Sequence, residues 1–225
     1  GHFDHGGGLK TFLDANTKAP VYIHPRATGD YYGTLAPWMP DVLKRAGIIT
    51  RKIGIDRALV GNNPSRIVKV EKNLEASGGV WLIPEITRTR PLASGNRFLF
   101  ERTGNSFSPD SFLHEMILAV AESDGVAVFS GCAHSGIMNM ILTVKKLLGK
   151  PRIKAVVGGF HLCYPKSERS SESSRSNMEL AEELGRVVDG PIFTGHCTGS
   201  EAFSAMKQVL GDRLVKITTG STLVV

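Results

Sequence analysis

The alternation of apolar and polar residues becomes regular in the second half of the chain. Apolar stretches over 112–121 and 126–130 predict two strands, and the turn Glu122-Ser123-Asp124-Gly125 between them predicts a hairpin. Later elements continue the pattern: a helix over 136–148, a strand over 153–157, a strand over 192–194, a helix over 200–210 stopped by Gly211, and a last strand ending at 222–225. Strand and helix therefore alternate, which predicts helices packed on a sheet.

One helix boundary is predicted from side-chain chemistry. Ser176, with Glu179 three residues later, has the spacing of a capping box, in which each side chain accepts a hydrogen bond from a backbone N–H at the start of a helix. The helix would follow a serine-rich polar loop over 166–175 and would be closed by Gly190.

The first half of the chain is less regular. A loop over 2–8 is predicted to lead into a helix ending near Ala15, and a short strand follows over 21–23. Weaker patterns predict a helix over 41–46 and strands over 67–70 and 79–83. We therefore expect one domain over 1–225, in which 31–110 is an insertion-like, substrate-facing region.

Composition and charge narrow the class of protein. With 225 residues and 41% apolar content, the chain is long enough to bury a sizeable core. It contains no apolar run of roughly 20 residues, so no membrane partner is expected. Its three cysteines are too few for a disulfide framework, and a cytoplasmic location is the simplest expectation.

The net charge of +6 comes entirely from one segment, because 41–102 holds twelve Lys and Arg against six Asp and Glu. Such a positive field favours a small anionic substrate, for example one that carries phosphate, although a solvated basic face is an equal alternative. Nucleic acid is not expected as a partner, since the basic residues are not interleaved with stacking aromatics. A homo-oligomer is compatible with the sequence, which leaves the oligomeric state open.

The candidate chemistry is carried by histidines in glycine-rich turns. One cluster is the run His-Phe-Asp-His-Gly-Gly-Gly, which contains His2, Asp4 and His5. The other histidines of interest each follow a predicted strand within a glycine-flanked turn: His134, His161 and His196. Loops at one edge of a sheet converge, and small residues let several imidazoles approach one point. Convergent imidazoles and a carboxylate are what Zn²⁺, Fe²⁺ or Mn²⁺ require.

A single histidine after a strand is more often structural than a metal ligand, so the prediction rests on the combination. In the tight His-x-Asp-His turn, neighbouring side chains can point to two metal positions, and two ions about 3.5–4 Å apart can share a hydroxide. His24 and His114 lack glycine-rich surroundings and are interpreted as structural or surface residues. The cysteines are interpreted as small core residues, although Cys197, next to His196, can touch the site.

The run from His2 to His5 resembles the second part of the His-x-His-x-Asp-His signature of the metallo-β-lactamase superfamily. The resemblance implies an α/β (α+β) fold, the αβ/βα sandwich of that superfamily. It also implies an N-terminally truncated chain, because the first histidine and the strands before the signature are absent from the sequence as given. One metal would be held by the missing histidine, His2 and His134, and the other by Asp4, His5 and His196.

Three further runs resemble one branch of that superfamily, the dihydropterin-ribofuranosylaminobenzene phosphate synthases. They are Gly131–Gly136, Gly158–Leu162 and Gly195–Gly199. The branch implies transfer of a pterinylmethyl group onto an aminobenzene-ribosyl phosphate. Many superfamily members have a bridging aspartate where this chain has His161, so His161 is a ligand, a proton donor or a residue that supports a ligand.

The resulting hypothesis is a dinuclear metal-dependent hydrolase or transferase acting on a phosphate-bearing small molecule through a metal-bound hydroxide. Two divalent ions are expected, with zinc first and iron or manganese as alternatives, and Asp4 and His161 are the candidate catalytic residues. A pterin-pathway synthase is the specific form of this hypothesis. Two alternatives stay open: a non-hydrolytic redox or sensing module that keeps the fold and the metal, and an inactive fragment.

Overall fold

The structure, a computed structural model, describes residues 1–34, 43 and 50–225. Of the helix expected over 41–46, all but Leu43 lies outside the described residues. The chain divides into two compact units, each made of two stretches: Gly1–Lys72 with Asn96–Glu115 in unit 1, and Asn73–Gly95 with Met116–Val225 in unit 2. The region expected to be one insertion, 31–110, contributes to both units.

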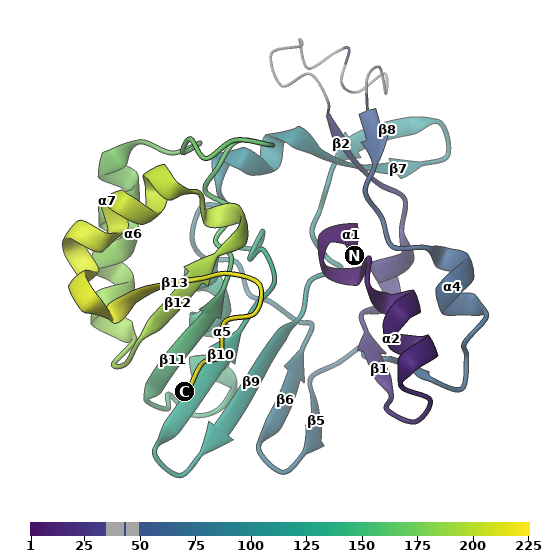
Figure 1. Ribbon diagram of the computed structural model, residues 1–225, viewed down its shortest axis with the longest axis horizontal. Helices are drawn as coiled ribbons and strands as arrows, with labels where there is room; N and C mark the ends of the chain where they lie inside the picture. Colours follow the sequence, from purple (N-terminus) through teal and green to yellow (C-terminus); the bar gives the residue numbers. More distant parts are fainter. Residues whose placement is uncertain (35–42, 44–49) are drawn as a thin grey trace. The chain divides into compact units, whose positions relative to one another are not determined.

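Unit 2 is built on a sheet in which the described strands have the order β13-β12-β11-β10-β9-β6-β5 (Figure 1). Their bounds are β5 Leu74–Ser77, β6 Val80–Ile83, β9 Ile117–Glu122, β10 Gly125–Phe129, β11 Ile153–Gly158, β12 Ile192–Gly195 and β13 Leu214–Ile217. From β10 to β13 the neighbours are parallel, whereas β9, β6 and β5 pair antiparallel. The carboxyl ends of β10, β11 and β12 therefore lie at one edge of the sheet.

Each parallel connection in unit 2 contains a helix: α5 Ile137–Leu147, α6 Ser174–Val187 and α7 Ser200–Leu210. All three contribute to one apolar core with the sheet, for example through the fully buried Ile141, Leu184 and Met206. Burying a side chain of this size contributes about 1.5–3 kcal/mol. This packing holds the sheet edge, and the loops that leave it, in fixed positions.

Several predictions for unit 2 are confirmed. The hairpin forms between β9 and β10, although 112–116 precede its first strand rather than belonging to it. Helices α5 and α7 lie where the apolar spacing placed them, and Gly211 ends α7 with φ of 54°, a conformation that glycine adopts without steric cost.

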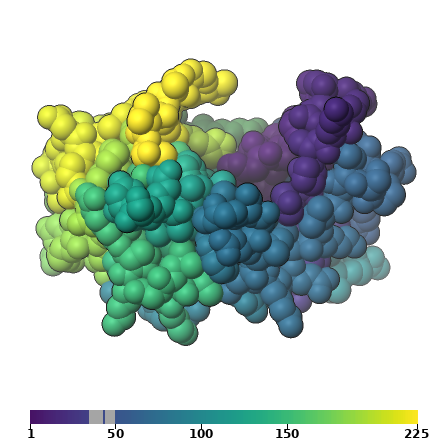
Figure 2. Space-filling model, turned by 90° about the horizontal axis from the view of Figure 1, so that it is seen from below, coloured from purple at the N-terminus to yellow at the C-terminus, as the bar shows by residue number. Residues whose placement is uncertain are grey.

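Two predictions for unit 2 are wrong. Helix α6 begins at Ser174 rather than after Ser176, because the Ser173 side chain accepts a hydrogen bond from the Ser176 N–H and acts as the N-cap. The same helix ends at Val187, before the expected Gly190. The last strand ends at Ile217 and not at 222–225, since β12 has by then paired along its whole length. In Figure 2 these final residues, in yellow, stand out from the surface of unit 2.

Unit 1 contains an antiparallel sheet of described strands in the order β3-β2-β7-β8 and a parallel pair, β1 with β4. Their bounds are β1 Val21–Ile23, β2 Tyr31–Thr34, β3 Thr50–Lys52, β4 Ile67–Lys69, β7 Leu99–Thr103 and β8 Ser106–Pro109. The helices are α1 Phe3–Gly6, α2 Leu9–Ala15, η1 Pro25–Thr28 and α4 Arg57–Gly61. The strand over 21–23 and the helix up to Ala15 are confirmed, but the expected loop over 2–8 contains the helical turn α1.

Among the described residues, no helix is long and apolar enough to cross a membrane.

Candidate metal centre

The N-terminal histidine cluster lies in unit 1, where the chain turns from an extended residue into α1. His2 forms an isolated antiparallel bridge with Gly54, and its carbonyl then accepts the N–H groups of His5 and Gly6. His2 is buried, while Asp4 and His5 are exposed on the helical turn. His5 Nε2 lies 3.8 Å from Asp4 Oδ2. The short turn therefore leaves the His2 side chain buried and those of Asp4 and His5 exposed.

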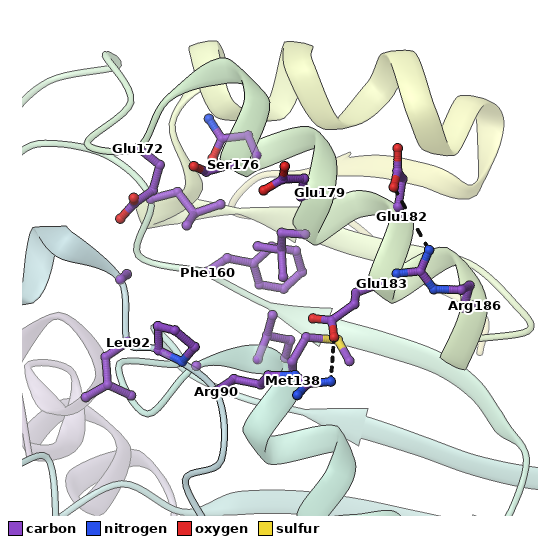
Figure 3. Close-up of a pocket in the computed structure, with 17 residues that line it drawn as sticks. Arg90, Leu92, Met138, Phe160, Glu172, Ser176, Glu179, Glu182, Glu183 and Arg186 are labelled. Carbon is purple, nitrogen blue, oxygen red and sulfur yellow. Dashed lines mark ion pairs between the residues drawn. The ribbon is translucent and has the colours of Figure 1, made fainter.

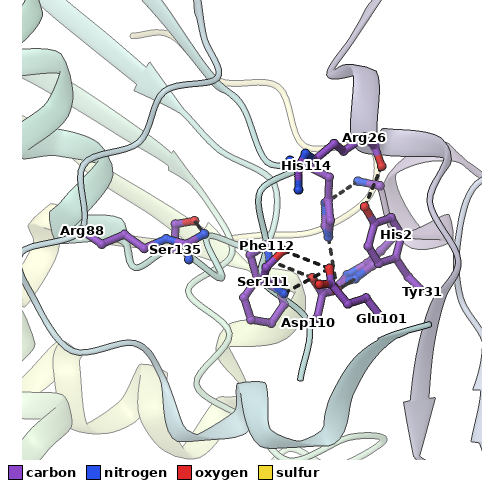
Figure 4. Close-up of polar contacts among 11 residues, drawn as sticks. His2, Arg26, Tyr31, Arg88, Glu101, Asp110, Ser111, Phe112, His114 and Ser135 are labelled. Carbon is purple, nitrogen blue, oxygen red and sulfur yellow. Dashed lines mark hydrogen bonds and ion pairs between the residues drawn. The ribbon is translucent and has the colours of Figure 1, made fainter. Parts of the chain in front are cut away.

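His2 belongs to a buried polar cluster that the sequence did not reveal. Its Nε2 lies 3.0 Å from Asp110 Oδ2, and Nε2 of His114 lies 3.2 Å from the same oxygen. Figure 4 shows both imidazoles directed at Asp110. The other carboxylate oxygen, Oδ1, accepts the backbone N–H of Phe112 at 2.7 Å. His114 is thus a buried structural partner, and the alternative that it is a surface residue is wrong.

The environment of Asp110 favours its ionised form. Burial raises the pKa of this carboxyl, but the hydrogen bonds from His114 and His2 outweigh that effect and hold the pKa well below its usual range. A carboxylate accepts hydrogen bonds and donates none, so both imidazoles present an Nε2 proton to it. For His2, this tautomer puts the lone pair on Nδ1, which is the atom that a metal would bind.

In unit 2, three histidines occupy loops at the carboxyl ends of neighbouring parallel strands. His134 follows β10, His161 follows β11, and His196 follows β12 at the start of the helical turn η3, His196–Thr198. The rings of His134 and His161 lie 4.1 Å apart between centroids. One ring nitrogen of each histidine and the sulfur of the buried Cys132 lie within 4.8 Å of one another. The structure therefore brings His134 and His161 together and adds Cys132, which was interpreted only as a core residue.

Hydrogen bonds tie the three loops to one another. The Gly159 N–H donates to the Gly131 carbonyl at 2.8 Å, which joins the loops after β10 and β11. Phe160 N–H donates to Thr198 Oγ1 at 3.1 Å, and His161 N–H donates to Cys197 Sγ at 3.3 Å. Close contact between these two loops requires glycine at position 159, because a Cβ there would lie 2.6 Å from Cys197 Sγ. Cys197 therefore contacts the loop that carries His161.

Two of the histidines have an unusual backbone. His161 has φ of 50° and His196 has φ of 49°, both in the left-handed region that residues other than glycine seldom adopt. Ala133, next to His134, has φ of 53°. Conformations of this kind cost free energy and persist where the surrounding structure enforces them, which is common at functional sites.

The residues of unit 2 fit a divalent metal ion. Both ring nitrogens of His161 are buried, and neither has a hydrogen-bond partner among the described residues. A buried polar group without a partner costs about 1–3 kcal/mol, so such groups need a specific explanation. Imidazole nitrogens beside a cysteine sulfur form a donor set that suits Zn²⁺ or Fe²⁺, and coordination of one nitrogen would remove part of that cost.

The ligand set expected from the sequence is divided between the two units. His2, Asp4 and His5 lie in unit 1, and His134 and His196 lie in unit 2. His24, interpreted as a structural or surface residue, accepts the Arg26 N–H through Nδ1 and caps η1.

Comparisons with known proteins agree with the resemblance carried by the motifs. No protein-family model matches the chain. The chain is 28% identical over 205 residues to a 7,8-dihydropterin-6-methyl-4-(beta-D-ribofuranosyl)-aminobenzene-5'-phosphate synthase from Methanocaldococcus jannaschii, with 89% of this chain and 65% of the synthase covered. It is 27% identical over 223 residues to an uncharacterized protein of the same organism, with 93% and 70% covered.

A solved structure resembles the chain as well. The crystal structure of Tm1679, described as a metal-dependent hydrolase of the beta-lactamase superfamily, has a TM-score of 0.72 and 21% identity, with 93% of this chain and 73% of that chain covered. The predicted α/β metallo-β-lactamase fold is therefore confirmed, as is the similarity to the synthase branch. The chain spans 65% of the length of the synthase it matches.

Proposed function

We propose that the protein is a metal-dependent enzyme that acts on a small anionic molecule at the centre formed by the histidine loops. The observation that carries the proposal is the arrangement in unit 2, where three histidine loops leave adjacent parallel strands and are hydrogen-bonded together. In this arrangement the rings of His134 and His161 are adjacent, and both ring nitrogens of His161 are buried without a hydrogen bond from the described residues. The names of the similar proteins, a synthase and a metal-dependent hydrolase, agree with this class.

The proposed ligand set holds two divalent ions. His2 and His134 would hold one ion, and Asp4, His5 and His196 would hold the other. Zinc is the first candidate, because imidazole and carboxylate ligands suit it, and iron or manganese are alternatives. When bound, such ions supply Lewis acidity that activates water near neutral pH and polarises the attacked bond.

Asp110 is proposed to position His2. Its Oδ2 accepts the Nε2 proton of His2, so Nδ1 is the nitrogen that can bind a metal, and the ring orientation is fixed. His114 holds the same oxygen from another direction, and the Phe112 N–H holds the second oxygen. The carboxylate cannot rotate without breaking these bonds, so the orientation of His2 is maintained.

His161 is proposed to act at the reacting centre, either as a proton donor or as a ligand. Its adjacency to His134 and its buried ring nitrogens without a hydrogen bond from the described residues support either role. The variant His161→Gln separates the two roles. A proton donor predicts a large fall in kcat with metal affinity within about twofold of wild type, whereas a ligand predicts that both fall together.

The substrate is proposed to carry phosphate, and the specific form of the proposal is a pterin-pathway synthase. The excess positive charge of 41–102 supports an anionic ligand, because such a field raises its local concentration. The similar synthase has a phosphate-bearing compound in its name.

The proposal is tested by turnover of phosphate esters and of the synthase substrate pair with wild type, Asp4→Ala, His134→Ala and the control His24→Ala. His24 caps η1 and takes no part in the proposed centre. We expect the first two variants to lose at least about 100-fold in kcat/KM and the control to match wild type. Full activity in Asp4→Ala and His134→Ala would show that the reaction does not use this centre.

A further inference from the structure

Unit 2 contains a cavity of about 550 Å³ on the helical side of its sheet, between the start of α5 and the helix α6 (Figure 3). The segment 90–93 and the residues Phe160 and Leu162 complete its lining. This volume is within the range of sites that bind small organic molecules. No role in the proposed metal chemistry is assigned to it.

The floor of the cavity is apolar. Figure 3 shows the Phe160 ring in its centre, with Met138 below it. Ile137, Leu162 and Leu180 add further apolar lining. An aromatic ring and a methionine together favour a flat aromatic occupant, because ring–ring and sulfur–ring contacts add to the burial of apolar surface.

A buried amide, Asn177, is among the residues that line the same cavity. Asn177 is 2% exposed, and its Oδ1 has no hydrogen-bond partner among the described residues. Its Nδ2 donates to Ser170 Oγ at 2.9 Å, while the Ser170 hydroxyl donates its only proton to the Leu162 carbonyl at 3.2 Å. Ser170 Oγ is therefore an acceptor for Asn177, which fixes the amide orientation and leaves Oδ1 without a partner.

The charges of the lining are negative in sum. The glutamates outnumber the arginines by four to two: Glu172, Glu179, Glu182 and Glu183 against Arg90 and Arg186. Both arginines are also paired, Arg90 with Glu183 at 2.7 Å and Arg186 with Glu182 at 4.0 Å. An anion entering the cavity would meet excess negative charge and no unpaired guanidinium group, whereas a cation would be favoured.

We propose that this cavity binds a small aromatic molecule with a cationic amidine or amine group. The ring would lie on the apolar floor, and an N–H of the cationic group would donate to Asn177 Oδ1. Within the described residues this buried oxygen accepts no hydrogen bond, and the cationic group would donate a charge-assisted one. Its occupant would contact Phe160 and Leu162, which flank His161 in sequence.

The test is ligand-observed NMR titration of the metal-loaded protein with benzamidine, and with benzoate as an anion of the same shape. Benzamidine is expected to bind at least about tenfold more tightly than benzoate. The variant Asn177→Leu, similar in volume but without the acceptor, is expected to weaken benzamidine binding at least about tenfold. The control Asp189→Asn removes a carboxylate that pairs with Arg152 outside the cavity, and it should bind as wild type.

A second variant fills the cavity: Leu180→Trp should abolish binding while the protein still unfolds cooperatively at a temperature close to that of wild type. The proposal is overturned if benzoate binds as tightly as benzamidine, if neither binds, or if folded Asn177→Leu binds benzamidine within twofold of wild type.

Discussion

The substitution Asp110→Asn tests whether Asp110 positions His2 for metal binding. In the wild type, Oδ2 accepts protons from His2 and His114, and Oδ1 accepts the Phe112 N–H. The side-chain amide of the variant has one oxygen, and if the turn is preserved this oxygen accepts the Phe112 N–H as Oδ1 does in the wild type. The amide NH₂ then faces the two imidazoles, so Nε2 of His2 must become an acceptor and its proton must move to Nδ1.

The expected effect is a loss of metal affinity, because Nδ1 of His2 would have to lose a proton before it binds. Replacing the carboxylate partner of a metal-bound histidine typically costs 10- to 100-fold in affinity, or about 1.4–2.8 kcal/mol. We also expect the metal-free protein to lose about 1–3 kcal/mol of folding free energy, since hydrogen bonds to a charged group become bonds to a neutral one.

The assay is competition for Zn²⁺ against a chromophoric chelator at pH 7.5, with urea unfolding of the metal-free proteins alongside it. The matched control is Glu101→Gln, which lies in the same unit and binds Ser111 at 2.9 Å without being a partner of either imidazole. Wild-type affinity in a folded Asp110→Asn variant would refute the reasoning, as would an equal loss in Glu101→Gln.

The remaining predictions concern the loops and the metal. Gly159→Ala should lower the free energy of unfolding, measured in urea, by about 1–3 kcal/mol, because the added Cβ would meet Cys197. The control Gly61→Ala should leave the free energy of unfolding unchanged, since its added Cβ meets nothing within 4 Å. Asn139→Leu should lower the free energy of unfolding by at least about 3 kcal/mol, because the buried Asn139 amide hydrogen-bonds to backbone groups of residues 89, 90 and 135. A variant as stable as wild type would contradict this prediction. Chelation should lower the thermal midpoint of wild type by more than that of His134→Ala, because the variant holds fewer ions, and added Zn²⁺ should restore the midpoint of wild type; equal shifts in the two proteins would contradict this.

The sheet edge that carries three of the histidines was predictable because its signals are local. Each strand is followed by a glycine-flanked histidine and then by a chain that returns as a helix, so the order along the sequence translates into neighbouring loops. His134 and His161 meet for this reason, although their own turns are 27 residues apart in the numbering.

The partners of His2 were not predictable in the same way. Asp110 lies 108 residues further along the chain, and nothing in its neighbourhood distinguishes it from a surface aspartate. Its role depends on burial between two imidazoles, which only the folded unit provides. Asn177 is similar, because its fixed amide depends on a serine hydroxyl whose proton is used elsewhere.

Local signals also failed where several residues compete for one role. The run Ser-Glu-Ser-Ser-Arg-Ser offers more than one N-cap, and Ser173 caps α6 although Ser176 has the better sequence pattern. Near the end of the given sequence, the apolar pattern predicted a last strand ending at 222–225. A strand also needs a neighbour, and β12 is already paired with β13 up to Ile217.

The central claim, that the histidine loops form a metal centre, is tested most directly by elemental analysis of divalent metal per chain in the purified protein. We predict close to two ions for wild type and for His24→Ala, and clearly fewer for Asp4→Ala and His134→Ala. A folded wild-type protein without bound metal, or the same metal content in all four proteins, would contradict the account.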